Sequence, residues 1–153
     1  MKKTSVLLIP ILILLLIGLH QIYAKSANSF YGAWVVNRQL ATGPVYALSD
    51  EEINNLIGKT IYYSATKAAF GNKVCQKPFY KIQTVPEDDF LVDNKLYLKE
   101  VGINRHSITM VEIYTDQSAQ SFWGGYGSIF YPKSKNQIIM NMDGVWFELM
   151  RKK

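Results

Sequence analysis

The chain has few of the residues on which catalysis, metal binding and disulfide bonding depend. Its 153 residues include one cysteine, Cys75, and two histidines. A single cysteine cannot form a disulfide within the chain, and we expect Cys75 to be a small buried hydrophobic residue. No G-x-S-x-G, H-E-x-x-H, paired C-x-x-C or phosphate-binding glycine-rich motif occurs in the sequence. The sequence therefore predicts a protein that is not an enzyme and that uses no cofactor and no metal.

The remaining candidates for chemistry have simpler explanations. His106 is the only histidine outside the N-terminal segment, and we expect it to be a surface residue or a core residue with satisfied hydrogen bonds. Glu112 and Glu148 fall inside predicted strands; a carboxylate pair about 5 to 9 Å apart would suit glycoside hydrolysis, but we favour two outward-facing polar residues. The acidic residues at positions 87–93 match no EF-hand spacing, and they are better explained as the start of a helix.

Charge is scarce and almost balanced. Seventeen Lys and Arg stand against twelve Asp and Glu, and 48% of the residues are hydrophobic. The excess of positive charge is too small and too scattered for a nucleic-acid footprint, so we expect no nucleic acid as partner. The one cationic cluster, Arg151 to Lys153, is either a solvated terminus or a segment attracted to an anionic membrane surface.

The N-terminus predicts export. Lys2 and Lys3 precede an uncharged run from Val6 to Leu19, which is the pattern of a secretory signal. Cleavage after Ala24 is expected, although an uncleaved membrane anchor remains the alternative. We therefore expect residues 1–24 to be a signal peptide or anchor, 25–29 a linker and 30–153 one domain. The protein would be extracytoplasmic, and it would meet the membrane only through an uncleaved N-terminal segment.

The rest of the sequence is dominated by strand signals. Short apolar stretches rich in β-branched and aromatic residues alternate with Gly, Pro, Asn and Asp. One short helix is expected after the first strand, because Ser49 and Glu52 form a capping box and Gly58 favours a stop. A further helical turn is expected from Leu96 to Glu100. The expected strands are eight: Tyr31–Asn37, Lys59–Ser64, Lys67–Phe70, Pro78–Val85, Ser107–Thr115, Tyr126–Pro132, Gln137–Met142 and Val145–Arg151.

These strands suit a single antiparallel up-and-down β-barrel, because closure removes exposed sheet edges. Gly32-Ala33-Trp34 is a G-x-W triplet at the start of the first strand, and the last strand ends in Arg151. At these residues the chain resembles the lipocalin-like, or calycin, barrels. The resemblance implies that Trp34 plugs one end of the barrel and that Arg151 packs across its indole, which cation–π attraction would stabilise by about 0.5 to 2 kcal/mol.

A second resemblance covers nearly all of the chain beyond the signal. The early G-x-W triplet, the Phe70-Gly71 pair, Cys75 ahead of Pro78, and the terminal segment 143–149 are similar to those of small exported bacterial proteins of unassigned activity. This resemblance implies a compartment and a fold, and it implies no reaction.

The loop before the sixth strand is the most suggestive feature for binding. Phe122, Trp123 and Tyr126 are set among glycines in this loop, where they would contact a ligand or partner, or else fold back to cap the core. We therefore expect a non-catalytic binding module for an unknown protein, including an inhibitor or immunity-type protein. The alternative is a carrier of a small apolar ligand inside the barrel, with a small hydrolytic enzyme third.

Overall fold

The computed structural model describes residues 29–153. The expected signal or anchor at 1–24 and most of the 25–29 linker lie outside the described residues. Among residues 29–153, no helix has the length and apolar character needed to cross a bilayer.

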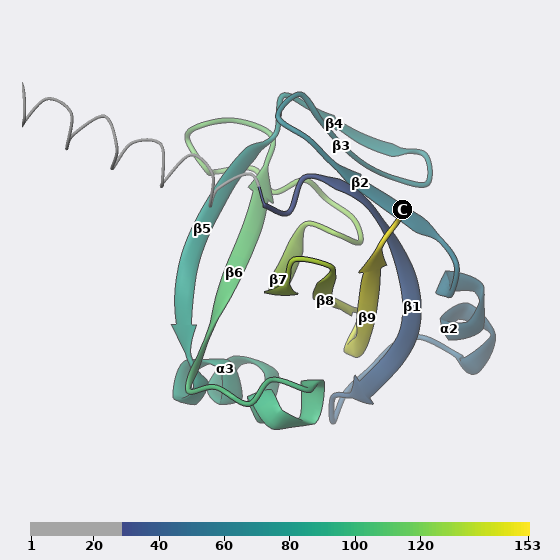
Figure 1. Cartoon of the computed structure of the whole chain (residues 1–153), viewed down its shortest axis with the longest axis vertical. Coiled ribbons are helices and arrows are strands. Elements are labelled where there is room, and N and C mark those ends of the chain that lie inside the picture. The colour runs from purple at the N-terminus through teal and green to yellow at the C-terminus, as the bar shows by residue number, and fades with distance from the viewer. Residues whose placement is uncertain (1–28) are drawn as a thin grey trace, which may run out of the picture.

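The domain is mainly β, with nine antiparallel strands in one sheet (Figure 1). Their order across the sheet is β4-β3-β2-β1-β9-β8-β7-β6-β5. The prediction of eight strands was therefore one short, because the strand at 73–76 was missed. The elements are β1 (Gly32–Thr42), α2 (Asp50–Leu56), β2 (Thr60–Tyr63), β3 (Lys67–Phe70), β4 (Lys73–Gln76), β5 (Phe79–Pro86), α3 (Glu87–Asn94), the three-ten helix η1 (Leu98–Val101), β6 (Ser107–Tyr114), β7 (Ile129–Ser134), β8 (Gln137–Met142) and β9 (Val145–Arg151).

The sheet curls into a half-barrel, so the prediction of a closed or nearly closed antiparallel barrel is confirmed in part, as a mainly β, curled antiparallel sheet. Strands β4 and β5 form the two edges, and no backbone ladder joins them. A side chain of β5 reaches the other end of the sheet, since the Tyr80 hydroxyl donates to the Ser64 carbonyl in the β2–β3 turn at 2.8 Å. Along β1 the register with β9 shifts between Val36 and Arg38 and again between Gln39 and Ala41. Such bulges bend a strand and increase its twist.

The C-terminal meander of β7, β8 and β9 forms as predicted. Met142 pairs with Val145 across the two-residue turn, in which Asp143 and Gly144 have φ of 49° and 85°. A two-residue hairpin turn with positive φ at both positions matches the right-handed twist of the strands. Gly144 is required for a second reason, because a Cβ atom there would lie 2.2 Å from the Val45 carbonyl oxygen.

The helices begin where the sequence indicates. Ser49 and Glu52 form the predicted reciprocal capping box of α2, and Gly102 ends η1 in the left-handed conformation. Helix α3 starts with the acidic cluster, which places three carboxylates at the positive end of its dipole. The predicted helix start at 87–89 is therefore confirmed.

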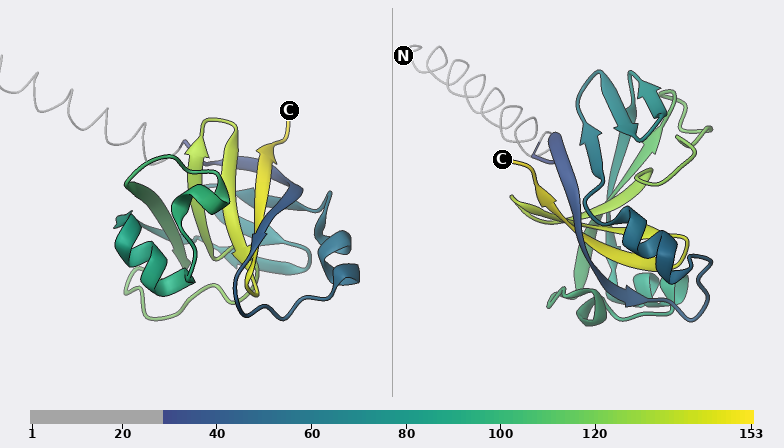
Figure 2. Two further views of the ribbon diagram at one scale, coloured as in Figure 1. Left: turned by 90° about the horizontal axis from the view of Figure 1, so that it is seen from below. Right: turned by 90° about the vertical axis from the view of Figure 1, so that its right-hand side faces the viewer.

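Two hydrophobic clusters lie on opposite faces of β7, β8 and β9. One face packs against β1, β2 and β3 through side chains such as Trp34, Phe130 and Phe147. The other face is covered by α3 and η1, which bury Tyr131 and Trp146. Figure 2 shows these helices lying across the strands. Within residues 29–153, no helix covers the outer side of β2, β3 and β4 in this way.

Candidate functional site

The structure brings together Trp34 and Arg151, as the sequence predicted. The Arg151 guanidinium carbon lies 4.2 Å from the centre of the Trp34 ring, and Trp34 is fully buried. The indole Nε1 donates to the Phe30 carbonyl at 2.8 Å, so its one polar atom is satisfied.

The Arg151 side chain also binds two backbone carbonyls at the start of the domain. Its Nη1 and Nη2 donate to the carbonyls of Tyr31 at 2.6 Å and Ser29 at 2.5 Å. Gly32 has φ of 137°, and a Cβ there would lie 2.7 Å from Arg151 Nη1. Together with the bond from Nε to the Lys135 carbonyl, all three nitrogens of the guanidinium donate to backbone carbonyls of the chain. The arrangement of Gly32, Trp34 and Arg151 is therefore structural.

The aromatic loop divides between the core and the surface. Trp123 is 4% exposed and belongs to the larger hydrophobic cluster, so of the two roles that the sequence left open for it, recognition or the core, the structure places it in the core. Phe122 is 47% exposed, and its ring stacks on Tyr114 with centroids 4.4 Å apart. Of the three predicted residues, only Phe122 and Tyr126 present area to solvent.

Tyr126 lies in the wall of a surface groove. Its hydroxyl donates to Asp143 Oδ2 at 2.6 Å, and this bond together with burial raises its pKa to about 12. The same ring is 6.1 Å from that of Phe70 on β3. These contacts hold the two aromatic side chains in place at one side of the groove.

The groove has a volume of about 630 Å³ and is mainly apolar. It runs between α2, which lies beside β2 in Figure 1, and the β2–β3 part of the sheet. Its apolar wall is formed by Leu48, Leu56 and Phe70 together with Tyr126, and its polar wall by Glu52, Asn55, Lys59 and Thr60. Cavities of 300 to 1,000 Å³ with apolar walls and few polar groups are typical of binding sites.

Helix α2 sets the polar wall. Glu52 accepts hydrogen bonds from the Ser49 backbone and hydroxyl, each at 2.8 Å, and these bonds lower its pKa. Its carboxylate is therefore charged and fixed at neutral pH. The sequence pattern around Glu52 indicates only its capping role. Nothing in it indicates that α2 would face Tyr126, which is more than seventy residues away along the chain.

The barrel interior, where a small apolar ligand was expected as an alternative, is filled. Phe130, Met140, Met142 and Phe147 are all buried within the larger hydrophobic cluster. Four cavities of about 300 to 630 Å³ in the described part of the chain are lined by other residues.

The two strand glutamates are buried, contrary to the outward exposure that was expected. Arg38 Nε donates to Glu148 Oε1 at 2.9 Å, and Lys81 forms an ion pair with Glu112 at 3.1 Å. Strands β6 and β9, which carry the two glutamates, are separated by β7 and β8. Three strand spacings amount to about 14 Å, which is too far for the carboxylate pair of a glycosidase.

The other candidate residues form no site in the structure. His106 is exposed, and its nearest carboxylate is that of Glu87, at 4.0 Å. Cys75 is a free buried thiol, as expected. Within the part of the chain that the structure describes, no group of three or more His, Cys, Asp or Glu is placed to hold a metal ion.

Comparison with known proteins gives no relative. No family model matches the chain, and neither does any curated protein or solved structure.

Proposed function

We propose that the chain is an exported, non-catalytic binding module that acts through its exterior. The groove between α2 and β3 would receive an apolar side chain of a protein partner. The observation that carries the proposal is the contrast between a filled interior and an open apolar groove. Export rests on the signal pattern of the first 24 residues, and the resemblance to calycin barrels rests on the Trp34–Arg151 pair and the antiparallel meander.

The composition of the groove favours a protein partner. Its centre is apolar and aromatic, with Leu56, Phe70 and Tyr126, and its rim carries one acidic and one basic side chain, Glu52 and Lys59. Protein interfaces combine an apolar core with a polar rim in this way. A partner that places a large apolar side chain in the groove, with a basic group near Glu52 and an acidic group near Lys59, would complement it.

Binding without catalysis is supported by the placement of the polar groups. The buried carboxylates are on strands about 14 Å apart, and each is paired with a basic residue. The single histidine of the described domain is exposed at the start of β6, away from the residues that line the groove.

Site-specific photocrosslinking in the host cell tests this proposal. A benzoylphenylalanine is introduced at Asn55, which lines the groove, and the matched control carries it at Asn54. Both positions are exposed on α2, so they differ mainly in the side of the helix that they occupy. We expect a discrete protein adduct from position 55 and none from position 54.

The identity of the adduct decides between the candidates. Equal protein adducts from both positions, or none, would contradict a partner in the groove. An adduct of lipid or another small apolar molecule at position 55 would favour the carrier. The substitution Lys59→Glu should remove the protein adduct, because it reverses the charge at the rim.

A further inference from the structure

One face of the sheet is left open to solvent. Tyr62 on β2 pairs with Ala33 on one side and Ala69 on the other, and Ala69 pairs with Val74. Side chains of directly paired residues share a face, so these four residues form one row across β1 to β4. Their neighbours Ile61 and Tyr63 face the core.

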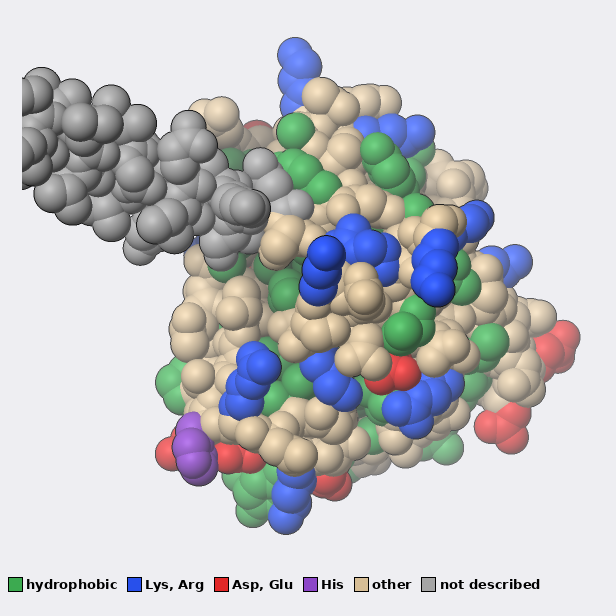
Figure 3. Space-filling model, viewed as in Figure 1, with side chains coloured by type: hydrophobic (Ala, Val, Ile, Leu, Met, Phe, Trp, Pro, Cys, Tyr) green, Lys and Arg blue, Asp and Glu red, His purple; other side chains and the backbone are tan. Residues whose placement is uncertain are grey.

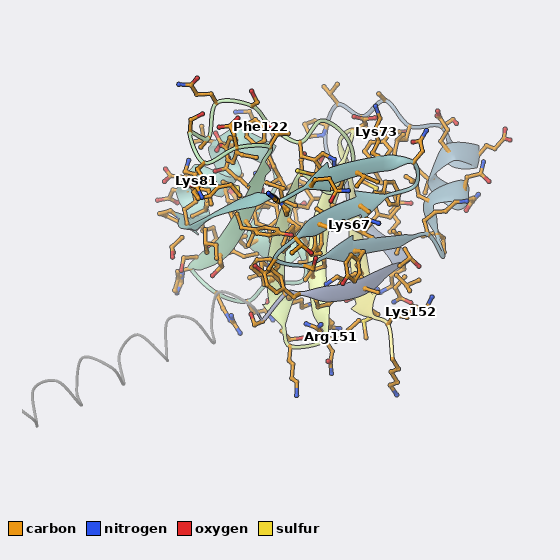
Figure 4. The ribbon with its side chains drawn as sticks, turned by 90° about the horizontal axis from the view of Figure 1, so that it is seen from above. Lys67, Lys73, Lys81, Phe122, Arg151 and Lys152 are labelled. Atoms are coloured by element: carbon orange, nitrogen blue, oxygen red, sulfur yellow. The ribbon has the colours of Figure 1, made fainter. Side chains whose placement is uncertain are left out.

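This row, which we call the outer row, is apolar and accessible. Tyr62 is 41% exposed and Val74 is 45% exposed. Figure 4 looks onto this side of β2, β3 and β4. In contrast, the outer face of β7 to β9 is covered by α3 and η1.

Lysines border the outer row. Lys67 lies two residues before Ala69 on β3, and therefore on the same face. At the other end of the row, the Lys152 backbone N–H donates to the Ala33 carbonyl at 2.8 Å, which places Lys152 opposite Ala33. Figure 4 labels both lysines on this part of the molecule.

Negative charge is absent from this part of the chain. Between Ile53 and Pro86 the sequence has five lysines and no Asp or Glu. The carboxylates concentrate in the first turns of α2 and α3 instead. In Figure 3 most of the visible acidic side chains lie at the right and lower margins, by these helices, whereas Lys and Arg occupy the middle and top.

The chain enters the domain at the edge of the same face. Ser29 is bound by Arg151, the residue before Lys152, and only three residues lie between Ser29 and Ala33 in the outer row. Ten residues lie between Leu19, the end of the apolar N-terminal run, and Phe30. Fully extended, ten residues span at most about 36 Å, so a membrane that holds the run is within reach of this face.

We propose that the outer row and its bordering lysines lie on the surface of a lipid bilayer that carries anionic headgroups. Exposed apolar side chains flanked by lysines bind such a surface through both burial and charge. A second copy of the chain is a poorer occupant, because face-to-face pairing would bring lysines against lysines. This inference concerns a different surface from the groove, and it stands or fails independently of the protein partner.

The test compares two positions on the full chain inserted in vesicles. An environment-sensitive thiol label is attached to Val74→Cys in the outer row and, as the matched control, to Val92→Cys on α3. Val92 is 63% exposed and lies in an acidic segment. Wild-type chain serves as the blank, because Cys75 is buried and burial raises the pKa of its thiol. Quenching by lipids that carry a nitroxide near the headgroup is then measured.

We expect quenching of the label at position 74 in phosphatidylcholine vesicles that contain about one third phosphatidylglycerol, and little in pure phosphatidylcholine. The label at 92 should stay unquenched in both. Lys67→Gln and Lys152→Gln should each lower about fivefold the ratio of domains that lie on the bilayer to domains that do not. Neither change should release the chain from the vesicles.

Two results would overturn the proposal. Equal quenching at positions 74 and 92 would show that the domain has no preferred orientation on the bilayer. A concentration-dependent disulfide or label excimer between two chains at position 74, with no quenching by lipid, would identify a second copy as the occupant instead.

Discussion

The contact between Trp34 and Arg151 leads to a quantitative prediction about stability. Trp34→Ala removes a fully buried indole that also donates a hydrogen bond to Phe30. Replacing a buried tryptophan by alanine costs about 3 to 5 kcal/mol. For a domain of this size, 1 kcal/mol shifts the melting temperature by about 4 °C, so we expect Tm to fall by about 12 to 20 °C.

A double-mutant cycle separates the cation–π contact from the packing. Arg151→Met keeps a flexible apolar side chain over the ring, but it loses the charge and the bonds to Ser29, Tyr31 and Lys135. We expect a coupling energy of about 0.5 to 2 kcal/mol between the Trp34→Ala and Arg151→Met changes. Denaturant unfolding of the wild type, both single variants and the double variant measures it.

Trp34→Phe is the control, because it keeps an aromatic ring in the site and loses only the N–H donor and part of the volume. It should destabilise the protein less than Trp34→Ala. A melting shift of a degree or two for Trp34→Ala, or costs that add within about 0.3 kcal/mol in the cycle, would refute the view that this pair holds the first and last strands together.

Two further predictions concern the aromatic loop and a buried charge. Trp123→Ala should lower the free energy of unfolding by about 3 to 5 kcal/mol, because the Trp123 side chain is in the core. Phe122→Ala should lower it by less than about 1.5 kcal/mol, because it loses one exposed stack on Tyr114. Similar melting shifts for the two variants would contradict this assignment. The hydrogen bond from Arg38 lowers the pKa of Glu148 below its usual 4.5. The stability that the charged Glu148 contributes is therefore present above pH 4.5, and it is lost as the pH falls through the pKa of the folded state. Glu148→Gln should therefore destabilise the chain at pH 7 by about 1 to 2 kcal/mol, and the difference from wild type should shrink towards pH 3; an unchanged difference in denaturant midpoint would show that the charge of Glu148 does not matter.

The elements that the sequence predicted well are those with a local chemical requirement. The Asp143-Gly144 turn needs two residues that tolerate positive φ, and the capping box of α2 needs Ser49 and Glu52 three residues apart. Trp34 and Arg151 were paired through a family pattern, and the register of β1 with β9 places them opposite each other.

The missed elements lack such a requirement. Strand β4 has four residues, of which only Cys75 is buried, so it shows no alternating apolar pattern. Helix α3 was predicted only at its acidic start, because it buries only Phe90 and so has no helical periodicity from which its extent could be detected. Because segment 87–103 covers one face of β7 to β9, Glu148 is buried on a side that alternation alone assigns to solvent.

Two features depend on distant parts of the chain: whether the barrel closes, and whether the groove forms. Whether β4 pairs with β5 depends on how far the whole sheet curls between them, and strand alternation contains no information on it. The groove forms because α2 and the loop that carries Tyr126 meet. The glycine-rich loop pattern fitted both a surface role and a core role for Trp123, and only packing distinguishes the two.

The pairing of β1 with β9 along its whole length has a consequence for biosynthesis. The first strand of the described domain pairs with the ninth, so the middle of the sheet stays unfinished until Arg151 has left the ribosome. Contacts of such large sequence separation form slowly. A chain that stops before Val145 would expose β1 as an unpaired edge, and we expect it to aggregate or to be degraded.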